Sequence, residues 1–262
     1  MKKIIPAFFC LLAFYTNAQV SNKNNNPADS VKKDLLTVPD TVKHLHSTFR
    51  SLVVPVTLVA YGGLSFVVKP IRNIDYYVKG RIERSGPNFN SRLSDYTQAA
   101  PAVLVYALNL AGDEGKNRFV DRTALLALSG AILTGADGLK YLGHRKRPYS
   151  NDPLSFPSGH TGAAFLAAEF LAQEYSEKSV WYGIGGYACA TVTGVLRLYD
   201  RAHWFSDCVA GAGLGILSVK ASYWVYPHLR KIFTHKDSQG RSTMIMPTYQ
   251  NGMPGISFAM QL

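Results

Sequence analysis

The sequence predicts an all-α protein: a helical bundle of about five or six apolar helices, associated with a membrane and followed by a short C-terminal β-hairpin or irregular tail. Two observations support this fold class. Hydrophobic residues make up 47% of the 262 residues and charged residues only 17%, whereas soluble domains carry about 25% charged residues. The apolar residues also gather into helix-length segments, with polar clusters before residue 160 and near residue 200. Polar groups concentrated at the ends of apolar helices indicate a functional site.

The first 18 residues, MKKIIPAFFCLLAFYTNA, have the layout of a secretory signal peptide, with two lysines, a short apolar run and a small-residue cleavage site ending at Ala18. An uncleaved anchor is the alternative. Residues 19–46 are polar and rich in asparagine, and they are expected to form a linker. A signal of this kind predicts an exported protein of the bacterial cell envelope, either membrane-associated or periplasmic.

One helical domain is expected over residues 47–228, and the charge-free stretch 51–68 opens it. That stretch is just long enough to cross a bilayer, although Pro55 and the Gly62-Gly63 pair weaken it as a helix. Residues 69–98 are polar and basic and are expected to form a connector. Further apolar helices are expected at 97–112, 121–142, 160–175, 179–196 and 203–226.

The tail, residues 229–262, changes character. Asn251-Gly252 lies between apolar stretches, and this pattern predicts a hairpin turn. A frayed tail is the alternative.

The net charge of +11 indicates anionic partners, such as phosphates or lipid head groups. The basic residues are scattered, and no basic helix, zinc-finger spacing or RNP-like stretch is present, which argues against nucleic acid. The three cysteines form neither a disulfide framework nor a metal-binding spacing. We therefore expect no metal ion and no nucleic-acid partner.

The first polar cluster holds two cations, Lys140 and Arg147, the latter directly before Pro148. Seven residues are about two helical turns, so both cations can lie on one side. Two fixed cations near a helix end form a clamp for a dianion. A pair of solvated basic residues is the alternative for this stretch taken alone.

The stretch SFPSGHT, residues 155–161, precedes an apolar run and opens the next expected helix. The first N–H groups of a helix lack helical partners and attract anions. Ser158 suits the N-cap, and Gly159 lets the backbone approach a ligand. His160 then stands beside the bound anion, where a protonated imidazole donates to a leaving oxygen.

The third cluster, GVLRLYDRAHWFSD, adds a cation at Arg197. His203 and Asp207 are spaced i, i+4, so one helix face carries both. A carboxylate beside an imidazole orients the ring and fixes its tautomer, which leaves the other nitrogen free to attack. A surface His–Asp pair of little energetic weight is the alternative. Together the clusters supply three cations, a backbone cradle, an acid and a nucleophile.

These motifs resemble the type 2 phosphatidic acid phosphatase superfamily, which includes lipid phosphatases, class A acid phosphatases and vanadium haloperoxidases. KYLGHRKRP, from Lys140 to Pro148, matches Lys-six residues-Arg-Pro, and Pro157 to His160 matches Pro-Ser-Gly-His. LRLYDRAHWFSD, from Leu196 to Asp207, matches the third motif except that Leu196 replaces its leading serine. The resemblance covers roughly residues 97–226.

The resemblance implies a phosphatase without metal or other cofactor. It implies that His203 attacks phosphorus to form a phosphohistidine, that Asp207 orients it, and that His160 protonates the leaving alkoxide. The remaining motif residues would hold the phosphoryl oxygens: Lys140, Arg147, Ser158, Gly159 and Arg197.

Apolar helices favour a lipid or polyprenyl phosphate as substrate. Charges within the expected helices, at Asp137, Glu169, Glu174 and Lys220, favour the alternative of a soluble exported acid phosphatase for small esters, since they are costly facing lipid. No feature favours a vanadate-dependent haloperoxidase. The complete set of catalytic positions argues against a purely structural membrane bundle.

The expected topology contains a conflict. Cleavage of the signal leaves the mature N-terminus outside, so crossings by 51–68, 97–112 and 121–142 would place Lys140 on the cytoplasmic side. An exported site requires one fewer crossing, an uncleaved anchor or peripheral helices.

Overall fold

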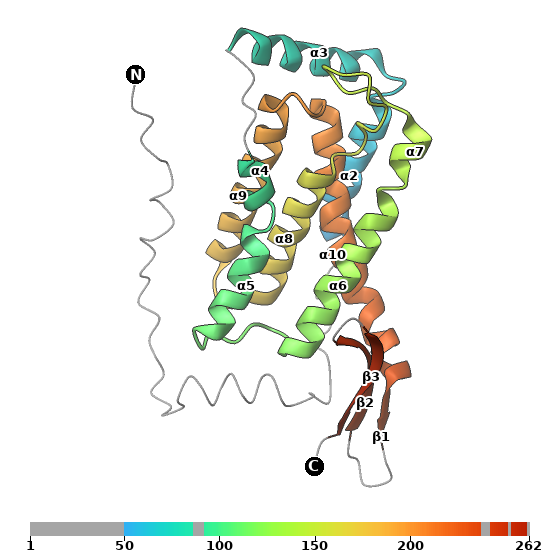
Figure 1. Ribbon diagram of the computed structural model, residues 1–262. Helices are drawn as coiled ribbons and strands as arrows, with labels where there is room; N and C mark the ends of the chain where they lie inside the picture. The colour runs from blue at the N-terminus through green and yellow to red at the C-terminus, as the bar shows by residue number, and fades with distance from the viewer. Residues whose placement is uncertain (1–49, 86–91, 237–241, 251–252, 261–262) are drawn as a thin grey trace.

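The structure is a computed structural model that describes residues 50–85, 92–236, 242–250 and 253–260 (Figure 1). The helices are α2 (Arg50–Leu64), α3 (Lys69–Arg84), α4 (Leu93–Thr97), α5 (Ala100–Leu110), α6 (Phe119–Ala136), α7 (Leu139–Gly143), α8 (Gly159–Tyr175), α9 (Val180–Tyr199) and α10 (Phe205–Phe233). The strands are β1 (Thr234–Lys236), β2 (Ser242–Gln250) and β3 (Met253–Met260). The expected signal peptide, 1–18, and linker, 19–46, lie outside the described residues.

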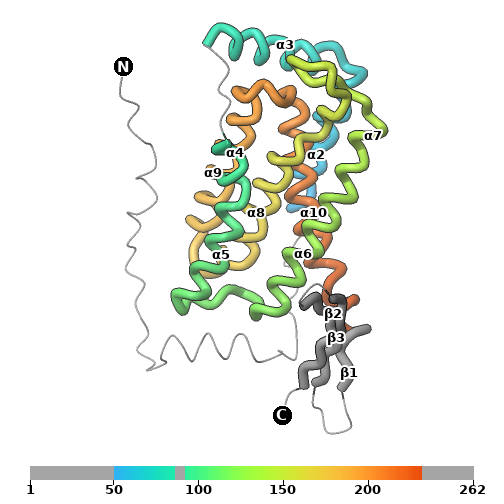
Figure 2. Tube along the Cα trace, in the orientation of Figure 1, coloured from blue at the N-terminus to red at the C-terminus, as the bar shows by residue number. Residues whose placement is uncertain are grey.

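The long helices form a bundle, as expected for an all-α fold. Helix α8 packs against α5, α9 and α10, and α10 also packs against α2 and α6. Large apolar side chains fill the centre, with Phe170 and Leu171 of α8 meeting Leu125 of α6 and Val219 of α10. Figure 2 shows that α3 lies across the end of this bundle, roughly at right angles to α2, in agreement with the 87° bend between the two helices.

Helices α8 and α10 approach each other backbone to backbone. A Cβ atom added to Gly215 would lie 2.2 Å from the carbonyl oxygen of Gly162, and one added to Gly211 would lie 2.4 Å from that of Ser158. Only glycine permits so close an approach. The contact also sets the first turn of α8 beside the first turns of α10, where Ser158 N–H donates to the backbone oxygen of Asp207 at 3.1 Å.

The charged residues of the expected helices are paired inside the bundle. Glu174 accepts hydrogen bonds from Arg122 at 3.2 Å and from Asn117, and both Glu174 and Arg122 are buried. Glu169 is buried and forms an ion pair with Lys220 at 2.9 Å. These charges are compensated by protein partners rather than by water.

The prediction of a polar connector over residues 69–98 is wrong, because most of it is helical as α3 and α4. Pro70 fits the first turn of α3, where no backbone N–H is needed. The helix is amphipathic, and Asp75 on its inner side is buried against the bundle. Tertiary docking of one face therefore stabilises a helix whose other face is polar and basic.

Several expected helix ends differ from the structure. The segment 121–142 is divided into α6 and α7 at Asp137-Gly138, and His144 closes α7 in the left-handed region with φ of 42°. Helix α5 has only 11 residues. At a rise of about 1.5 Å per residue it spans roughly 16 Å, too short for a bilayer core of about 30 Å. Helix α10 continues to Phe233, beyond the expected domain boundary at residue 228.

Two described helical segments are long and apolar enough to cross a membrane, Phe119–Gly143 and Phe205–Lys231. The bent pair of α2 and α3 becomes a third if it is counted as one span. Because α5 is too short to cross a bilayer, the segment 97–112 is not a crossing. With one crossing fewer, Lys140 no longer has to lie on the cytoplasmic side.

The tail contains the hairpin rather than the irregular alternative. Strands β2 and β3 pair antiparallel, with Gln250 opposite Met253, and β1 adds a third strand on the other side of β2. The turn residues 251–252 lie outside the described residues.

The close approach of α8 and α10 predicts that Gly215→Ala destabilises the fold. The added methyl group overlaps the Gly162 carbonyl, and overpacking of this kind costs about 1–3 kcal/mol. Gly185→Ala on α9 is the matched control, because a Cβ there meets no atom within 4 Å and alanine favours helix by about 1 kcal/mol. Thermal midpoints in detergent test this, and equal midpoints for the two variants would contradict the packing argument.

Candidate active site

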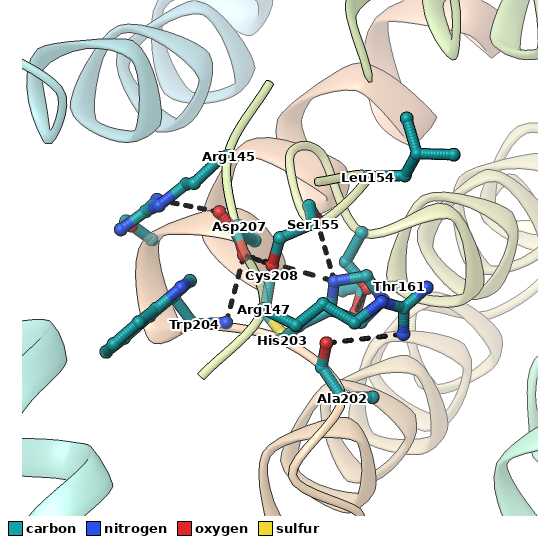
Figure 3. A network of polar contacts seen from close by, with 12 residues as sticks. Arg145, Arg147, Leu154, Ser155, Thr161, Ala202, His203, Trp204, Asp207 and Cys208 are labelled. Carbon is teal, nitrogen blue, oxygen red and sulfur yellow. Dashed lines mark hydrogen bonds and ion pairs between the residues drawn. The ribbon is translucent and has the colours of Figure 1, made fainter. Parts of the chain in front are cut away.

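His203 lies in the turn just before α10 and is almost fully buried, with 5% of its surface exposed. Its Nδ1 lies 2.8 Å from the backbone carbonyl of Ser155, which can only accept a hydrogen bond. The ring proton is therefore on Nδ1, and Nε2 keeps its lone pair. Figure 3 shows the ring between the Ser155 segment and the extended side chain of Arg147.

The environment of His203 keeps its ring neutral. Burial, followed by the positive charges of Arg147, Arg197 and Lys140, lowers the pKa of His203 from 6.5 to about 3. The sequence motifs predicted all three cations as phosphate-binding residues, and in the structure the positive charge of each acts on this ring. A neutral imidazole with a free Nε2 is the form that attacks phosphorus.

Asp207 does not contact His203 in the way expected from the i, i+4 spacing. Its Oδ2 lies 3.9 Å from His203 Nδ1, beyond hydrogen-bond range, and instead accepts from Ser155 Oγ at 2.5 Å and Trp204 N–H at 2.9 Å. Ser155 therefore joins the two residues: its hydroxyl donates to Asp207 and its carbonyl holds His203. Asp207 acts on the ring through the Ser155 segment.

A second buried cation, Arg145, completes the surroundings of Asp207. Its Nη1 donates to Asp207 Oδ1 at 2.7 Å, and its Nη2 donates to Asp75 of α3 at 2.6 Å (Figure 3 shows the bond to Asp207). The guanidinium also lies 5.5 Å from the ring of Trp204. The negative charge of Asp207 is thus compensated mainly by Arg145.

The other polar residues of the motifs gather at the same end of the bundle. Ser158 is the N-cap of α8, where its Oγ lies 3.0 Å from Thr161 Oγ1. A Cβ added to Gly159 would lie 3.2 Å from Lys140 Nζ. Gly159 therefore leaves room for the Lys140 ammonium directly at the start of α8, which the helix dipole already makes attractive to anions.

Each cation of the site has a carboxylate partner. Lys140 Nζ lies 2.7 Å from Asp137, Arg147 Nε 2.7 Å from Asp152, and Arg197 Nη1 3.4 Å from Asp200. His160 Nε2 lies 2.9 Å from Asp95 of α4. These partners hold the cations in place around the pocket.

A groove of about 560 Å³ opens beside this end of the bundle, between α6 and α8. Its polar end is formed by Asp137, Lys140, Gly159 and His160. Its walls are mainly apolar, with Leu126, Gly130 and Leu133 from α6 and Ala163 and Leu166 from α8. Lys140 is close to both histidines: it lines the groove together with His160, and its positive charge lowers the pKa of His203.

The structure thus brings all eight motif residues to one end of the bundle. Four functional neighbours were missed in the sequence: Asp75, Asp95, Arg145 and Ser155. Arg145 was visible within KYLGHRKRP as an additional basic residue, and Ser155 within SFPSGHT. Asp75 and Asp95 gave no signal beyond single acidic residues in a basic stretch. Within the described part of the chain, no three His, Cys, Asp or Glu side chains form a group suited to a metal ion.

Comparisons with known proteins agree with the motifs. Residues 141–231 match the model of the PAP2 superfamily. The chain is 28% identical over 221 residues to a lipid A 1-phosphatase of Porphyromonas gingivalis, an alignment that covers 82% of this chain and 48% of that protein. It is 30% identical over 124 residues to a probable lipid phosphate phosphatase 4 of Arabidopsis thaliana, covering 38% of this chain and 40% of that one.

Both alignments span less than half the length of these curated relatives. A crystal structure of a transmembrane PAP2 type phosphatidylglycerolphosphate phosphatase from Bacillus subtilis matches with a TM-score of 0.42 and 16% identity, over 67% of this chain and 96% of that one.

The matched segment begins one residue after Lys140 and contains the rest of the first motif and all of the other two. The resemblance to this superfamily that was drawn from the three motifs is therefore confirmed over residues 141–231.

Proposed function

We propose that the protein is a metal-independent phosphatase that hydrolyses a phosphomonoester or diphosphate of a lipid or polyprenyl substrate. The observation that carries this proposal is a neutral, tautomer-fixed His203 placed within the fields of Lys140, Arg147 and Arg197. Three cations stabilise a phosphoryl group as charge builds on its oxygens, and such stabilisation is usually a large part of catalysis.

The reaction proceeds in two steps. His203 Nε2 attacks phosphorus, the P–O bond to the leaving group breaks, and His160 gives its proton to the departing oxygen. This forms a phosphohistidine. His160, now neutral, takes a proton from water, which attacks phosphorus, and the P–N bond breaks to release phosphate and free His203.

The groove supports a substrate with an apolar tail. Its polar end contains Lys140 and His160, and its apolar walls extend away along α6 and α8. A phosphate held at the polar end would place an attached acyl or isoprenoid chain against leucine and alanine side chains. Burial of apolar surface adds binding energy that a small ester lacks.

The outer surface of the bundle supports placement in a membrane. Large exposed apolar side chains lie on α2, α5 and α9, among them Val53, Val54, Val103, Leu110, Ile184, Val192 and Val195. Exposed aromatic residues occur at both ends, with Tyr76, Tyr77 and Tyr141 near the site and Trp181 and Trp224 at the other. Trp224 lies roughly 29 Å along α10 from Phe205, at about 1.5 Å per residue. This matches a hydrocarbon core of about 30 Å with aromatic residues at its borders.

The argument for a soluble acid phosphatase becomes weaker. It depended on charges that would be costly facing lipid, but Glu169, Glu174 and Lys220 are paired within the bundle. Asp137 pairs with Lys140 at the site. We therefore favour a membrane enzyme with its site facing the cell envelope, as the signal-like N-terminus also suggests.

His203→Gln should abolish phosphate release, because Gln cannot form the covalent intermediate. The expected loss in kcat is about 10⁴-fold or more, as for other nucleophile or base replacements. His228→Gln, at an exposed position on α10, is the control and should keep wild-type turnover. Purified protein in detergent is assayed for released phosphate. Near wild-type turnover of the His203 variant would refute its role as nucleophile.

The lowered pKa of His203 predicts a pH-dependent stability. Between about pH 3 and 6.5 the unfolded chain binds a proton at this residue and the folded protein does not, so stability rises with pH across this range and is lost as the pH falls. Lowering the pH from 7 to 4.5 should therefore reduce the thermal midpoint less in His203→Gln than in wild type. An identical decrease in both proteins would mean that His203 titrates normally.

A side chain that fills the groove should separate lipid from small substrates. Gly130 lines the groove and has open space at its Cβ, so Gly130→Leu projects into it. The value of kcat/KM should fall about tenfold for phosphatidic acid in micelles and stay within about twofold for p-nitrophenyl phosphate.

Gly185→Leu is the matched control, since its Cβ also meets open space and the residue lies on α9 outside the groove. An equal loss on both substrates would contradict a tail-binding groove. A wild-type preference for p-nitrophenyl phosphate, with no detergent needed for solubility, would favour the soluble acid phosphatase.

A further inference from the structure

Arg145 is a buried cation that belongs to none of the positions assigned to phosphate binding or to chemistry. It is 5% exposed and lies between two buried carboxylates, with Nη1 2.7 Å from Asp207 and Nη2 2.6 Å from Asp75. Both acids face the start of α10. A cation so enclosed does not reach a substrate, so its effect must pass through its neighbours.

On one side Arg145 fixes the start of α10 to α3. Asp75 Oδ1 accepts from the backbone N–H of Ser206 at 2.8 Å, and its Oδ2 accepts from Ser206 Oγ at 2.7 Å. Arg145 Nη1 also donates to that hydroxyl at 2.7 Å. Asp75 thus caps the first turn of α10 from another helix, and Arg145 balances its charge.

On the other side Arg145 controls the direction of the Asp207 carboxylate. Oδ1 faces the guanidinium, and Oδ2 uses its lone pairs for Ser155 Oγ and Trp204 N–H. The Nδ1–H of His203 therefore donates to the Ser155 carbonyl and not to Asp207. The main chain reinforces this arrangement, because Ser155 N–H donates to the backbone oxygen of Arg145 at 3.0 Å.

We propose that Arg145 is a positioning residue for the nucleophile: it holds Asp207 away from His203, so that the Ser155 carbonyl fixes the ring with a free Nε2. The proposal rests on the phosphatase function proposed above. Without the guanidinium, the Asp207 carboxylate loses its counter-charge and is free to turn toward His203 Nδ1. The ring then gains proton affinity from the close carboxylate, so that more of it is protonated and unable to attack, and the Ser155 segment that sets its position loses its bond to Asp207.

Other titratable groups face these residues and are not substituted in the test. They are Asp75 and Lys79 of α3, Tyr149, and the cations of Lys140, Arg147 and Arg197. Asp75 also loses the guanidinium but keeps its two hydrogen bonds from Ser206, so a shift of His203 seen on replacing Arg145 alone is assigned to the release of Asp207.

The first measurement is steady-state kinetics of Arg145→Gln with p-nitrophenyl phosphate. We expect kcat to fall about 10²-fold, the loss typical of a misplaced catalytic group, with KM within about threefold of wild type. The acid limb of kcat/KM should move to higher pH. Arg145→Lys keeps a cation and should recover part of kcat and of the pH profile.

Arg122→Gln is the matched control for a purely structural effect. Arg122 is also buried and bonded to a carboxylate, Glu174, but it belongs to α6 and the network at the other end of the bundle. Its replacement should lower the thermal midpoint without shifting the acid limb. If Arg145→Gln lowers the midpoint and leaves the pH profile in place, its role is only structural and the proposal is overturned.

A second measurement does not depend on turnover. Heteronuclear NMR of protein labelled at histidine nitrogens gives the tautomer and titration of His203, assigned by its absence in His203→Gln. Wild type should show a neutral ring with its proton on Nδ1 at pH 6, and Arg145→Gln should show a raised pKa for His203.

An unchanged His203 titration in folded Arg145→Gln would overturn the proposal. If Arg145→Gln does not fold, the same two outcomes are read from Arg145→Lys. If wild type releases no phosphate from any substrate, the proposed function fails, and the NMR result still decides how His203 is positioned.

Discussion

The site depends on the close approach of α8 and α10. Gly211 and Gly215 allow the two backbones to meet, because a methyl group at either position would overlap the backbone carbonyl of Ser158 or Gly162. The start of α8 carries the anion-attracting N–H groups, and the turn before α10 carries His203, the proposed nucleophile. Residues 158 and 207, far apart in sequence, are joined there by a backbone hydrogen bond. The geometry of the chemistry is therefore set by helix packing before any charged side chain is considered.

Electrostatics then sorts the charged residues into two classes. Arg145 is buried and forms ion pairs with Asp75 and Asp207. Lys140, Arg147 and Arg197 instead lie around the pocket, where their charges lower the pKa of His203. Burial of a cation between two acids is costly unless all partners are held in place. The structure meets that requirement with α3, which supplies Asp75 across the end of the bundle. A helix that the sequence did not predict thus pairs with Arg145, which in turn bonds Asp207.

The motifs in the sequence located the reactive end of the molecule because each consists of adjacent or periodically spaced residues. The apolar segments predicted the bundle. Five of the six expected helices each correspond to one helix of the structure, and the sixth, 121–142, is divided into α6 and α7. What was missed has common physical causes. Helix α3 is stabilised by docking of one face around the buried Asp75, and its other positions remain polar and basic in the sequence. The partner of His203 is a backbone carbonyl, which every residue possesses, so no side-chain pattern points to Ser155. The i, i+4 spacing of His203 and Asp207 placed them on one face but did not give the direction of the carboxylate.

The pairing of each site cation with its own carboxylate has a consequence for turnover. Asp137, Asp152 and Asp200 already offset much of the positive field, and Asp95 does the same for His160. Under the proposed function, inorganic phosphate competes with these carboxylates for the cations and has no tail for the apolar groove. A lipid phosphate gains the contribution of the groove as well. For the proposed phosphatase, the acids that keep the cations in position would therefore also favour release of the cleaved anion and reduce product inhibition.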